Sequence, residues 1–261
     1  MMRCRELIEK LETLSPVSYA EDWDNVGLLA GRWEKEVTKV MIALDASDSV
    51  IQQAVTNGVD MLLTHHPLLF SPLKRVVSDD FVGRRMMELL RHDICYYAMH
   101  TNFDVMGMAD AVADEMNLKK REVLEITYED DISKEGIGRI GLLPQIMTLE
   151  ECAGYCKDVF NLEHVKVFGD LDMAVERAAV VPGSGKDFVN ISKEKRADVL
   201  ITGDIGHHPG MDAVAQGIAV IDAGHYGLEK IFVPYMKEFF FRELPQITVV
   251  SAKEEAPFRI L

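Results

Sequence analysis

The feature that most constrains the fold is the alternation of short apolar runs with stretches of helical periodicity. Each run is bounded by polar or turn-forming residues, which is typical of strands buried on both faces. Between the runs, segments such as residues 48–57 and 80–91 place apolar residues at helical spacing. Strands that alternate with helices predict an α/β fold with mainly parallel sheets. The predicted strands are Val40–Leu44, Met61–Thr64, Ile94–Met99, Ala178–Val181, Val199–Thr202, Ile218–Ile221 and Ile247–Val250.

The middle of the chain departs from this alternation. Arg121–Ile126 and Gly136–Leu143 are predicted strands, joined by an acidic turn. Thr148-Leu149-Glu150-Glu151 has the pattern of a capping box that opens a helix. We therefore expect two similar α/β domains, residues 1–125 plus 225–261 and residues 126–224. A later helix is predicted from Tyr226 to Leu244, with Pro234 kinking or dividing it.

The two alternating halves can be overlaid without gaps. One offset places Val40–Leu44 on Ala178–Pro182 and Asp60–Thr64 on Asp198–Thr202, and a second places His100-x-x-x-Asp104 on His225-x-x-x-Glu229. This match predicts an internal duplication. Chance agreement is the alternative, because buried strands share a similar composition.

Charge and cysteine content exclude several classes of protein. The 28 Lys+Arg against 43 Asp+Glu give a net charge of −15, which disfavours binding to nucleic-acid backbones. No apolar stretch reaches the roughly 18 residues of a membrane span, and the first residues lack the apolar core of a secretory signal. We expect a soluble, cytoplasmic protein with four reduced cysteines, because no zinc-finger spacing surrounds them. These are Cys4, Cys95, Cys152 and Cys156.

Histidines and carboxylates gather at the ends of the predicted strands. In parallel α/β sheets, ligands bind beyond the carboxyl ends of the strands. His225 and Glu229 are one helical turn apart and can point at the same ion. Adjacent residues on a strand diverge, so His65 and His66 converge only if their strand ends at Thr64, as Pro67 indicates. The predicted metal ligands are His65, His66, Asp104, His225 and Glu229, and His100 is either a ligand or a residue that orients one.

The ligand types indicate the class of metal. Imidazole and carboxylate without thiolate suit Zn, Fe, Mn, Co or Ni rather than Ca or Mg, and we expect Zn, Fe or Mn. Three histidines and two carboxylates exceed what one catalytic ion needs and predict two divalent ions that share a carboxylate. Such a pair polarises a substrate and activates water, so hydrolysis is the expected chemistry.

Other segments carry weaker signals. Gly183-Ser184-Gly185-Lys186 lacks the full phosphate-loop spacing and is more typical of a tight strand-to-helix turn, although Lys186 is a candidate phosphate contact. Asp45 ends the first buried strand and is a candidate for proton transfer together with His100. Asp204, His207 and His208 are candidate substrate contacts. Phe239-Phe240-Phe241 is apolar around its helix, as at a subunit interface.

Five ordered motifs resemble the GTP cyclohydrolase I type 2 (YbgI-like) family, and the resemblance covers essentially the whole chain. They are Asp22–Leu28, Thr64-His65-His66-Pro67, His100-Thr101-Asn102-x-Asp104, Thr202-Gly203-Asp204 and His225-x-x-x-Glu229. The resemblance implies a two-domain α/β protein with a dinuclear metal site between the domains. It assigns the same five ligands, with Glu229 bridging, and a ring-shaped homohexamer. The segment between Ile126 and Gly206 is too short for the extra middle domain of longer members.

Two functions remain open from the sequence. The first is a dinuclear metal-dependent hydrolase of cyclohydrolase type, acting on a small, purine-nucleotide-like molecule. The second is a non-catalytic, ring-shaped metal-binding scaffold. An open coordination position would favour the first, and ions fully ligated by protein would favour the second.

Overall fold

The computed structural model describes residues 2–260 and divides the chain into two compact units. The first unit is Met1–Phe103 with Phe232–Leu261, and the second is Asp104–Ile231. The predicted boundaries at 125/126 and 224/225 are therefore displaced. The reason is packing: helix α5 (Ala109–Glu115) and helix α9 (His225–Glu229) both contact strand β10 (Ala174–Ser184) of the second unit.

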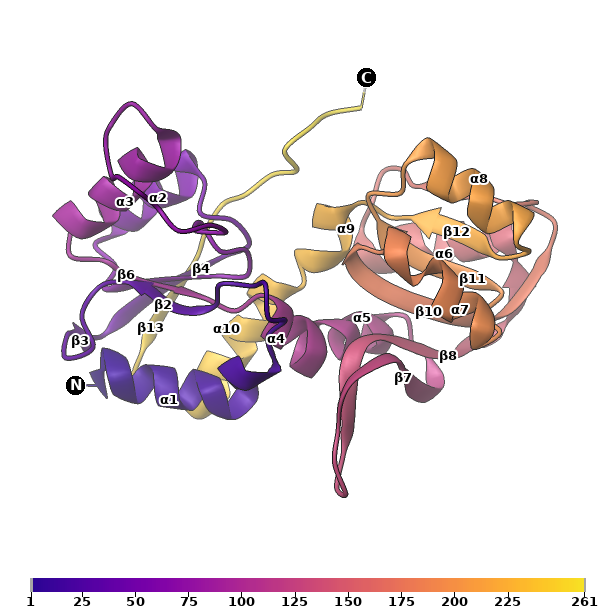
Figure 1. The fold of residues 1–261 in the computed structure, drawn as a ribbon, viewed down its shortest axis with the longest axis horizontal. Helices are drawn as coiled ribbons and strands as arrows, with labels where there is room; N and C mark the ends of the chain where they lie inside the picture. The colour runs from indigo at the N-terminus through magenta and orange to yellow at the C-terminus, as the bar shows by residue number, and fades with distance from the viewer. Residues whose placement is uncertain (1, 261) are drawn as a thin grey trace. The chain divides into compact units, whose positions relative to one another are not determined.

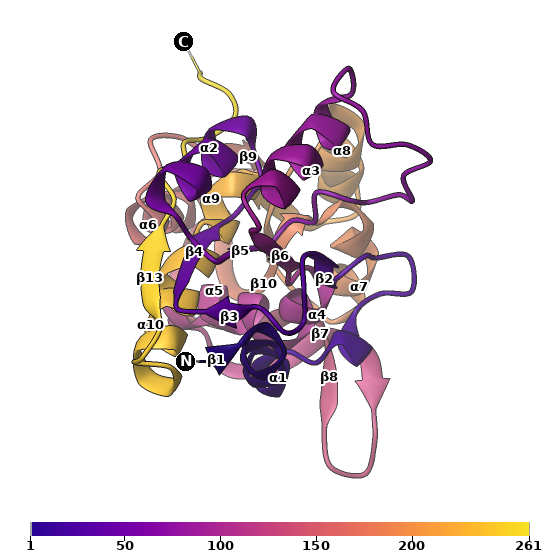
Figure 2. The ribbon, with the colours of Figure 1, turned by 90° about the vertical axis from the view of Figure 1, so that its left-hand side faces the viewer.

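The first unit contains a five-stranded sheet in the order β13-β4-β5-β6-β2. Neighbouring strands are parallel except β2, which pairs antiparallel with β6. Helices α2 and α3 cover one face, and α1 and α10 lie on the other (Figures 1 and 2). Its elements are β1 (Met2–Arg3), α1 (Cys4–Leu14), η1 (Val17–Tyr19), β2 (Gly27–Ala30), β3 (Glu36–Val37), β4 (Lys39–Ala43), α2 (Asp48–Asn57), β5 (Met61–Thr64), α3 (Phe81–Arg91), β6 (Cys95–Ala98), α4 (Thr101–Phe103), α10 (Phe232–Glu243) and β13 (Thr248–Ser251).

The second unit contains a six-stranded sheet in the order β7-β8-β10-β11-β12-β9. Its central strands β10, β11 and β12 are parallel, and β7, β8 and β9 pair antiparallel. Strands β7 and β8 continue as a long hairpin (Figure 1). The remaining elements are η2 (Asp104–Met108, a π-helix), β7 (Lys119–Glu129), β8 (Lys134–Thr148), α6 (Leu149–Phe160), β9 (Lys166–Phe168), η3 (Lys186–Phe188), α7 (Val189–Glu194), β11 (Val199–Gly203), α8 (His207–Ala215) and β12 (Ala219–Asp222).

Alternating residues of the central strands build two apolar layers in the second unit. Val199 and Ile201 pack with α5 and α6 on one face, and Leu200 packs with α7 and α8 on the other. The predicted capping box begins α6: Glu151 N donates to Thr148 Oγ1 at 3.1 Å, and Thr148 N donates to Glu151 Oε2 at 2.8 Å. The predicted mainly parallel α/β class is therefore confirmed.

The two units share a local order of strands. In β4-β5-β6-β2 and in β10-β11-β12-β9, three parallel strands are followed by an antiparallel strand that comes earlier in the chain. Asp60 and Asp198, which the predicted offset superimposes, make the same kind of contact with the backbone. One carboxylate oxygen of each accepts hydrogen bonds from two consecutive backbone N–H groups at 2.8–3.0 Å. The internal duplication itself stays a prediction.

The long helix predicted after Ile221 is divided in two. Helix α9 ends at Glu229, and α10 begins at Phe232, so Pro234 lies in the first turn of α10. Proline is tolerated there because the first N–H groups of a helix have no partner within the helix. Within residues 2–260, no helix has the length and apolar character needed to cross a membrane.

Candidate metal-binding groups

Three histidines lie together in the first unit, at the carboxyl ends of β5 and β6. His65 and His66 follow Thr64, where β5 ends, and His100 follows β6. The ring centroids of His65 lie 4.9 Å from His66 and 5.3 Å from His100. One ring nitrogen from each of the three lies within 4.8 Å of the others. The prediction that the strand ends before the paired histidines is confirmed.

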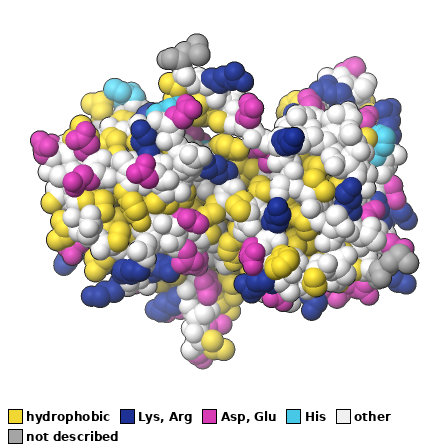
Figure 3. Space-filling model, turned by 180° about the vertical axis from the view of Figure 1, so that it is seen from behind, with side chains coloured by type: hydrophobic (Ala, Val, Ile, Leu, Met, Phe, Trp, Pro, Cys, Tyr) yellow, Lys and Arg dark blue, Asp and Glu magenta, His cyan; other side chains and the backbone are white. Residues whose placement is uncertain are grey.

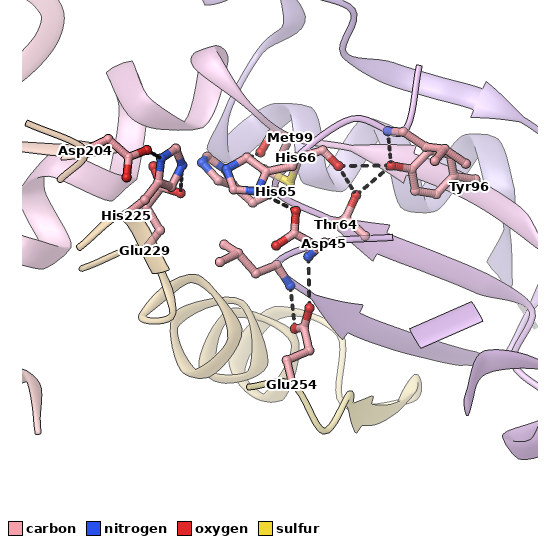
Figure 4. A network of polar contacts seen from close by, with 12 residues as sticks. Asp45, Thr64, His65, His66, Tyr96, Met99, Asp204, His225, Glu229 and Glu254 are labelled. Carbon is pink, nitrogen blue, oxygen red and sulfur yellow. Dashed lines mark hydrogen bonds and ion pairs between the residues drawn. The ribbon is translucent and has the colours of Figure 1, made fainter. Parts of the chain in front are cut away.

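A hydrogen-bonded turn explains why adjacent histidines converge. The hydroxyl groups of Thr64 and Tyr96 both donate to the carbonyl of His66, at 2.8 and 3.0 Å. Leu68 N donates to the Tyr96 hydroxyl at 2.7 Å (Figure 4). These bonds fold the chain back directly after Thr64, so the strand alternation no longer separates the two rings.

In each ring of this cluster, Nδ1 lies within hydrogen-bond distance of an oxygen acceptor. His65 Nδ1 lies 2.7 Å from the carbonyl oxygen of Met99, which can only accept a hydrogen bond. His66 Nδ1 lies 2.9 Å from Asp45, and His100 Nδ1 lies 2.9 Å from Asp24. Nδ1–H therefore donates, and the neutral ring carries its lone pair on Nε2. This is the form in which histidine binds a metal or accepts a proton.

Asp24 is a completely buried anion beside His100. Its side chain is 0% exposed, and burial alone would raise the pKa of the carboxyl. Hydrogen bonds from His100 and from the side chain and backbone of Thr101 outweigh burial and lower this pKa to about 2. Asp24 is therefore charged at neutral pH and fixes the orientation of the His100 ring.

A second carboxylate supports Asp45 from the C-terminal segment. Glu254 accepts hydrogen bonds from Leu44 N at 2.7 Å and from Asp45 N at 3.0 Å (Figure 4). Burial raises the pKa of Glu254, and the two backbone hydrogen bonds oppose that shift. Glu254 thus holds the end of β4 in the position from which Asp45 reaches His66.

The second unit carries its own group at the ends of β11 and β12. His225 begins helix α9, and its Nδ1 lies 2.9 Å from Asp204. Its Nε2 lies 2.9 Å from Oε2 of Glu229, which is 3% exposed (Figure 4). This geometry fits an ion pair, and it also fits two ligands of one ion, because metal–ligand bonds of about 2.0–2.2 Å bring neighbouring ligands to about 3 Å.

A glycine on β10 makes room for the Glu229 carboxylate. Gly183 has φ +77°, and a Cβ at this position would lie 2.6 Å from Glu229 Oε1 and 3.8 Å from His225 Cε1. Gly183 and Ser184 are the last residues of β10, and Gly185 alone joins the strand to η3, so the predicted strand-to-helix turn is shorter than expected. The absence of a side chain at Gly183 leaves space for the Glu229 carboxylate.

The other predicted site residues have different surroundings. Asp104 is the first residue of η2 in the second unit. His207 and His208 open helix α8 and are exposed, and their rings contact each other at 5.3 Å. Asp204, a predicted substrate contact, holds His225 through its Nδ1. The roles of these residues toward a substrate stay predictions.

Sequence reasoning missed three groups that matter here. The sequence marks Asp24 only as part of the Asp22–Leu28 motif, whereas the structure shows it as the buried partner of His100. Glu254 and the carbonyl of Met99 carry no signal, because backbone acceptors and distant carboxylates leave no local pattern. The donor set fits a transition metal: the imidazole Nε2 atoms are oriented by acceptors at Nδ1, and carboxylates complete the set.

Nearly the whole chain is similar to known proteins. Residues 2–257 match the family described as Duf34/NIF3 (NGG1p interacting factor 3). A "GTP cyclohydrolase 1 type 2 homolog" from Clostridium perfringens is 35% identical over 230 residues, which cover 87% of each chain. The solved structure of reduced HcgD from Methanocaldococcus jannaschii is 33% identical, with a TM-score of 0.84 over 97% of this chain and 98% of that chain.

A second solved structure shows the same fold at lower identity. The Bacillus cereus protein related to NIF3 is 24% identical, with a TM-score of 0.90 over 99% of each chain. The family matches nearly the full sequence, and the relatives match along most of their own length. The chain therefore belongs to the Duf34/NIF3 family.

Proposed function

We propose that this protein is a dinuclear metal-dependent hydrolase of cyclohydrolase type that acts on a small, purine-like molecule. The observation that carries the proposal is shared by four histidines, His65, His66, His100 and His225. Each places an acceptor at Nδ1 at 2.7–2.9 Å, which directs Nε2 toward a ligand; at His225, Nε2 lies beside the proposed ligand Glu229 at 2.9 Å. Four histidine rings oriented by acceptors at Nδ1 are not needed for the stability of the fold. Such an arrangement is typical of metal and catalytic sites.

The proposed ligands are His65, His66, Asp104, His225 and Glu229, with Glu229 shared between two ions of Zn, Fe or Mn. These five residues are the ones that the family resemblance assigns as ligands. Asp104 directly follows Phe103, where the first unit ends, and Glu229 lies just before the return of the chain at Phe232. Two such ions, when bound, would polarise the substrate and activate water near neutral pH.

The remaining polar residues orient rings and move a proton. Asp24 holds the proton of His100 Nδ1 and would stabilise the imidazolium formed when Nε2 takes a proton from water or substrate. Asp45 and Asp204 hold His66 and His225 in the same way, and Glu254 fixes Asp45. His207 and His208 are proposed to contact the substrate from helix α8.

The test combines metal content with hydrolysis of purine substrates. We expect about two ions per chain after loading with zinc, iron or manganese. Glu229→Gln should lose metal and ring-opening activity. Glu163→Gln, an exposed glutamate of the same unit, is the matched control and should retain both. A metal-free wild-type protein, or equal activity of the two variants, would contradict the proposal.

The alternative, a ring-shaped scaffold, is supported by exposed apolar side chains. Phe241 on α10 is 75% exposed, and Ile132 in the β7–β8 turn is 93% exposed; hydrophobic side chains reach the end of the hairpin (Figure 3). We propose a homohexamer, which light scattering during gel filtration would measure. A metal-loaded hexamer with no activity on purine substrates would favour the scaffold.

A further inference from the structure

A large cavity in the first unit lies next to the histidine cluster. Its volume is about 980 Å³, near the upper end of the range for small-molecule sites. Its walls come from the end of β4, the starts of α2 and α3, the loop after β5 and the C-terminal segment. His66 and Asp45 form part of the wall, so a molecule in the cavity would contact residues of the proposed reaction.

The sheet topology favours ligand binding at this place. Strand β4 lies between β5 and β13. The chain passes from β4 through α2 to β5 on one side, and it reaches β13 on the other side from α10. Helix α2, which follows β4, covers one face, and α10, which precedes β13, packs on the other (Figure 2). Such a reversal leaves a crevice at the carboxyl ends of the strands, where α/β proteins bind ligands. Asp45 and Glu254 lie at this reversal.

The apolar part of the wall includes two accessible aromatic rings. Phe70 and Phe81 line the cavity together with Leu68, Leu69 and Val82. The two phenylalanine side chains are 56% and 55% exposed. Aromatic rings left accessible within a concave site offer stacking surfaces for a flat ligand.

The charges of the wall disfavour a phosphate chain. Three carboxylates, Asp45, Glu254 and Glu255, face two cations, Arg85 and Lys253. Arg85 is already engaged, because its Nε donates to Asp48 at 2.8 Å and its guanidinium lies 5.1 Å from the Phe81 ring centroid. A triphosphate would bring several negative charges toward this acidic wall. Asp45 and Glu254 already accept hydrogen bonds from His66 and from two backbone N–H groups. Each carboxylate has further lone pairs, so these groups and Glu255 suit the ring N–H and amino groups of a heterocycle, which donate hydrogen bonds.

We propose that this cavity binds a purine base or nucleoside without a phosphate chain. The proposal rests on the proposed function for the reaction that follows binding at His66. It narrows the substrate class: the ring stacks on Phe70 and Phe81, and its N–H groups face the carboxylates. Nucleotides then enter the reaction only after another enzyme has removed their phosphates.

The test is calorimetric titration of the full chain after treatment with EDTA, so that triphosphates cannot bind through a metal. Guanosine or adenosine should bind at least about tenfold more tightly than GTP or ATP. Phe81→Ala should weaken nucleoside binding about tenfold. Trp33→Ala removes an exposed aromatic ring of the same unit that does not line the cavity, and it should leave nucleoside binding unchanged. Phe70→Ala replaces Phe81→Ala if that variant does not fold.

The outcomes separate this inference from the proposed function. Triphosphates that bind as tightly as nucleosides, no binding of either nucleoside, or equal effects of the Phe81 and Trp33 variants would each overturn the inference. Metal uptake is measured separately, on portions of the same proteins loaded with zinc, iron or manganese and freed of unbound metal, without EDTA. Metal uptake without nucleoside binding would overturn this inference but not the proposed metal centre. Nucleoside binding to a protein that takes up no metal would refute the metal centre but not nucleoside binding in the cavity.

Discussion

Replacing Gly183 by alanine should weaken metal binding far more than it weakens the fold. The new Cβ would lie 2.6 Å from Glu229 Oε1, well inside van der Waals contact, so the carboxylate must move. Moving the end of a side chain costs little stability. The left-handed backbone at φ +77° adds about 1–2 kcal/mol of strain, or a decrease in Tm of a few degrees.

Gly217→Ala provides the matched control in the same unit. Gly217 has φ +85°, and a Cβ added there would meet no atom within 4 Å, so this variant carries the backbone strain without the clash. Both variants should lose similar stability in thermal unfolding of the metal-free protein. Only Gly183→Ala should lower zinc affinity, by about 10–100-fold in competition with a chromogenic chelator. Equal affinities of the two variants would refute the assignment of Glu229 as a ligand.

Three further predictions concern stability and reactivity. Because its carboxyl pKa of about 2 is below the ordinary value of 3.8, Asp24 stabilises the metal-free fold above pH 4, by about 2 kcal/mol. This contribution disappears as the pH falls toward 2, and Asp24→Asn should abolish that pH dependence in urea unfolding. Asp60→Asn and Asp198→Asn should each cost about 1–2 kcal/mol in the same assay; a large difference between them would argue against equivalent roles. Burial raises the pKa of Cys152 and Cys156 to about 12, so a disulfide reagent should modify them only after denaturation, and rapid labelling of the native protein would contradict their burial.

The parts of the fold that depend on local signals could be predicted from the sequence. Buried strands such as Met61–Thr64 are visible as apolar runs, and the capping box at Thr148 fixes the start of α6. Short edge strands could not be found in this way. Strand β2 (Gly27–Ala30) exists because it pairs with β6, and its own sequence has no strand pattern.

The candidate ligands were predictable because they occupy strand ends and helical spacings. Their supporting partners were not, since these arise only when distant segments fold together. Asp24 meets His100 across 76 positions, and Glu254 meets Asp45 across 209. The predicted unit boundaries differ from the observed ones for a similar reason. Helices α5 and α9 join the second unit through contacts with β10, and β10 is distant from both of them in the sequence.

The pairing of β13 with β4 has a consequence for biosynthesis. Thr248–Ser251 pair with Lys39–Ile42, so the first sheet lacks one strand until these later residues have left the ribosome. The second unit, which lies entirely between Asp104 and Ile231, can complete its own sheet earlier. Until β13 is synthesised, one edge of β4 has unpaired backbone N–H and C=O groups. A chaperone that binds exposed strand edges would bind the nascent chain there.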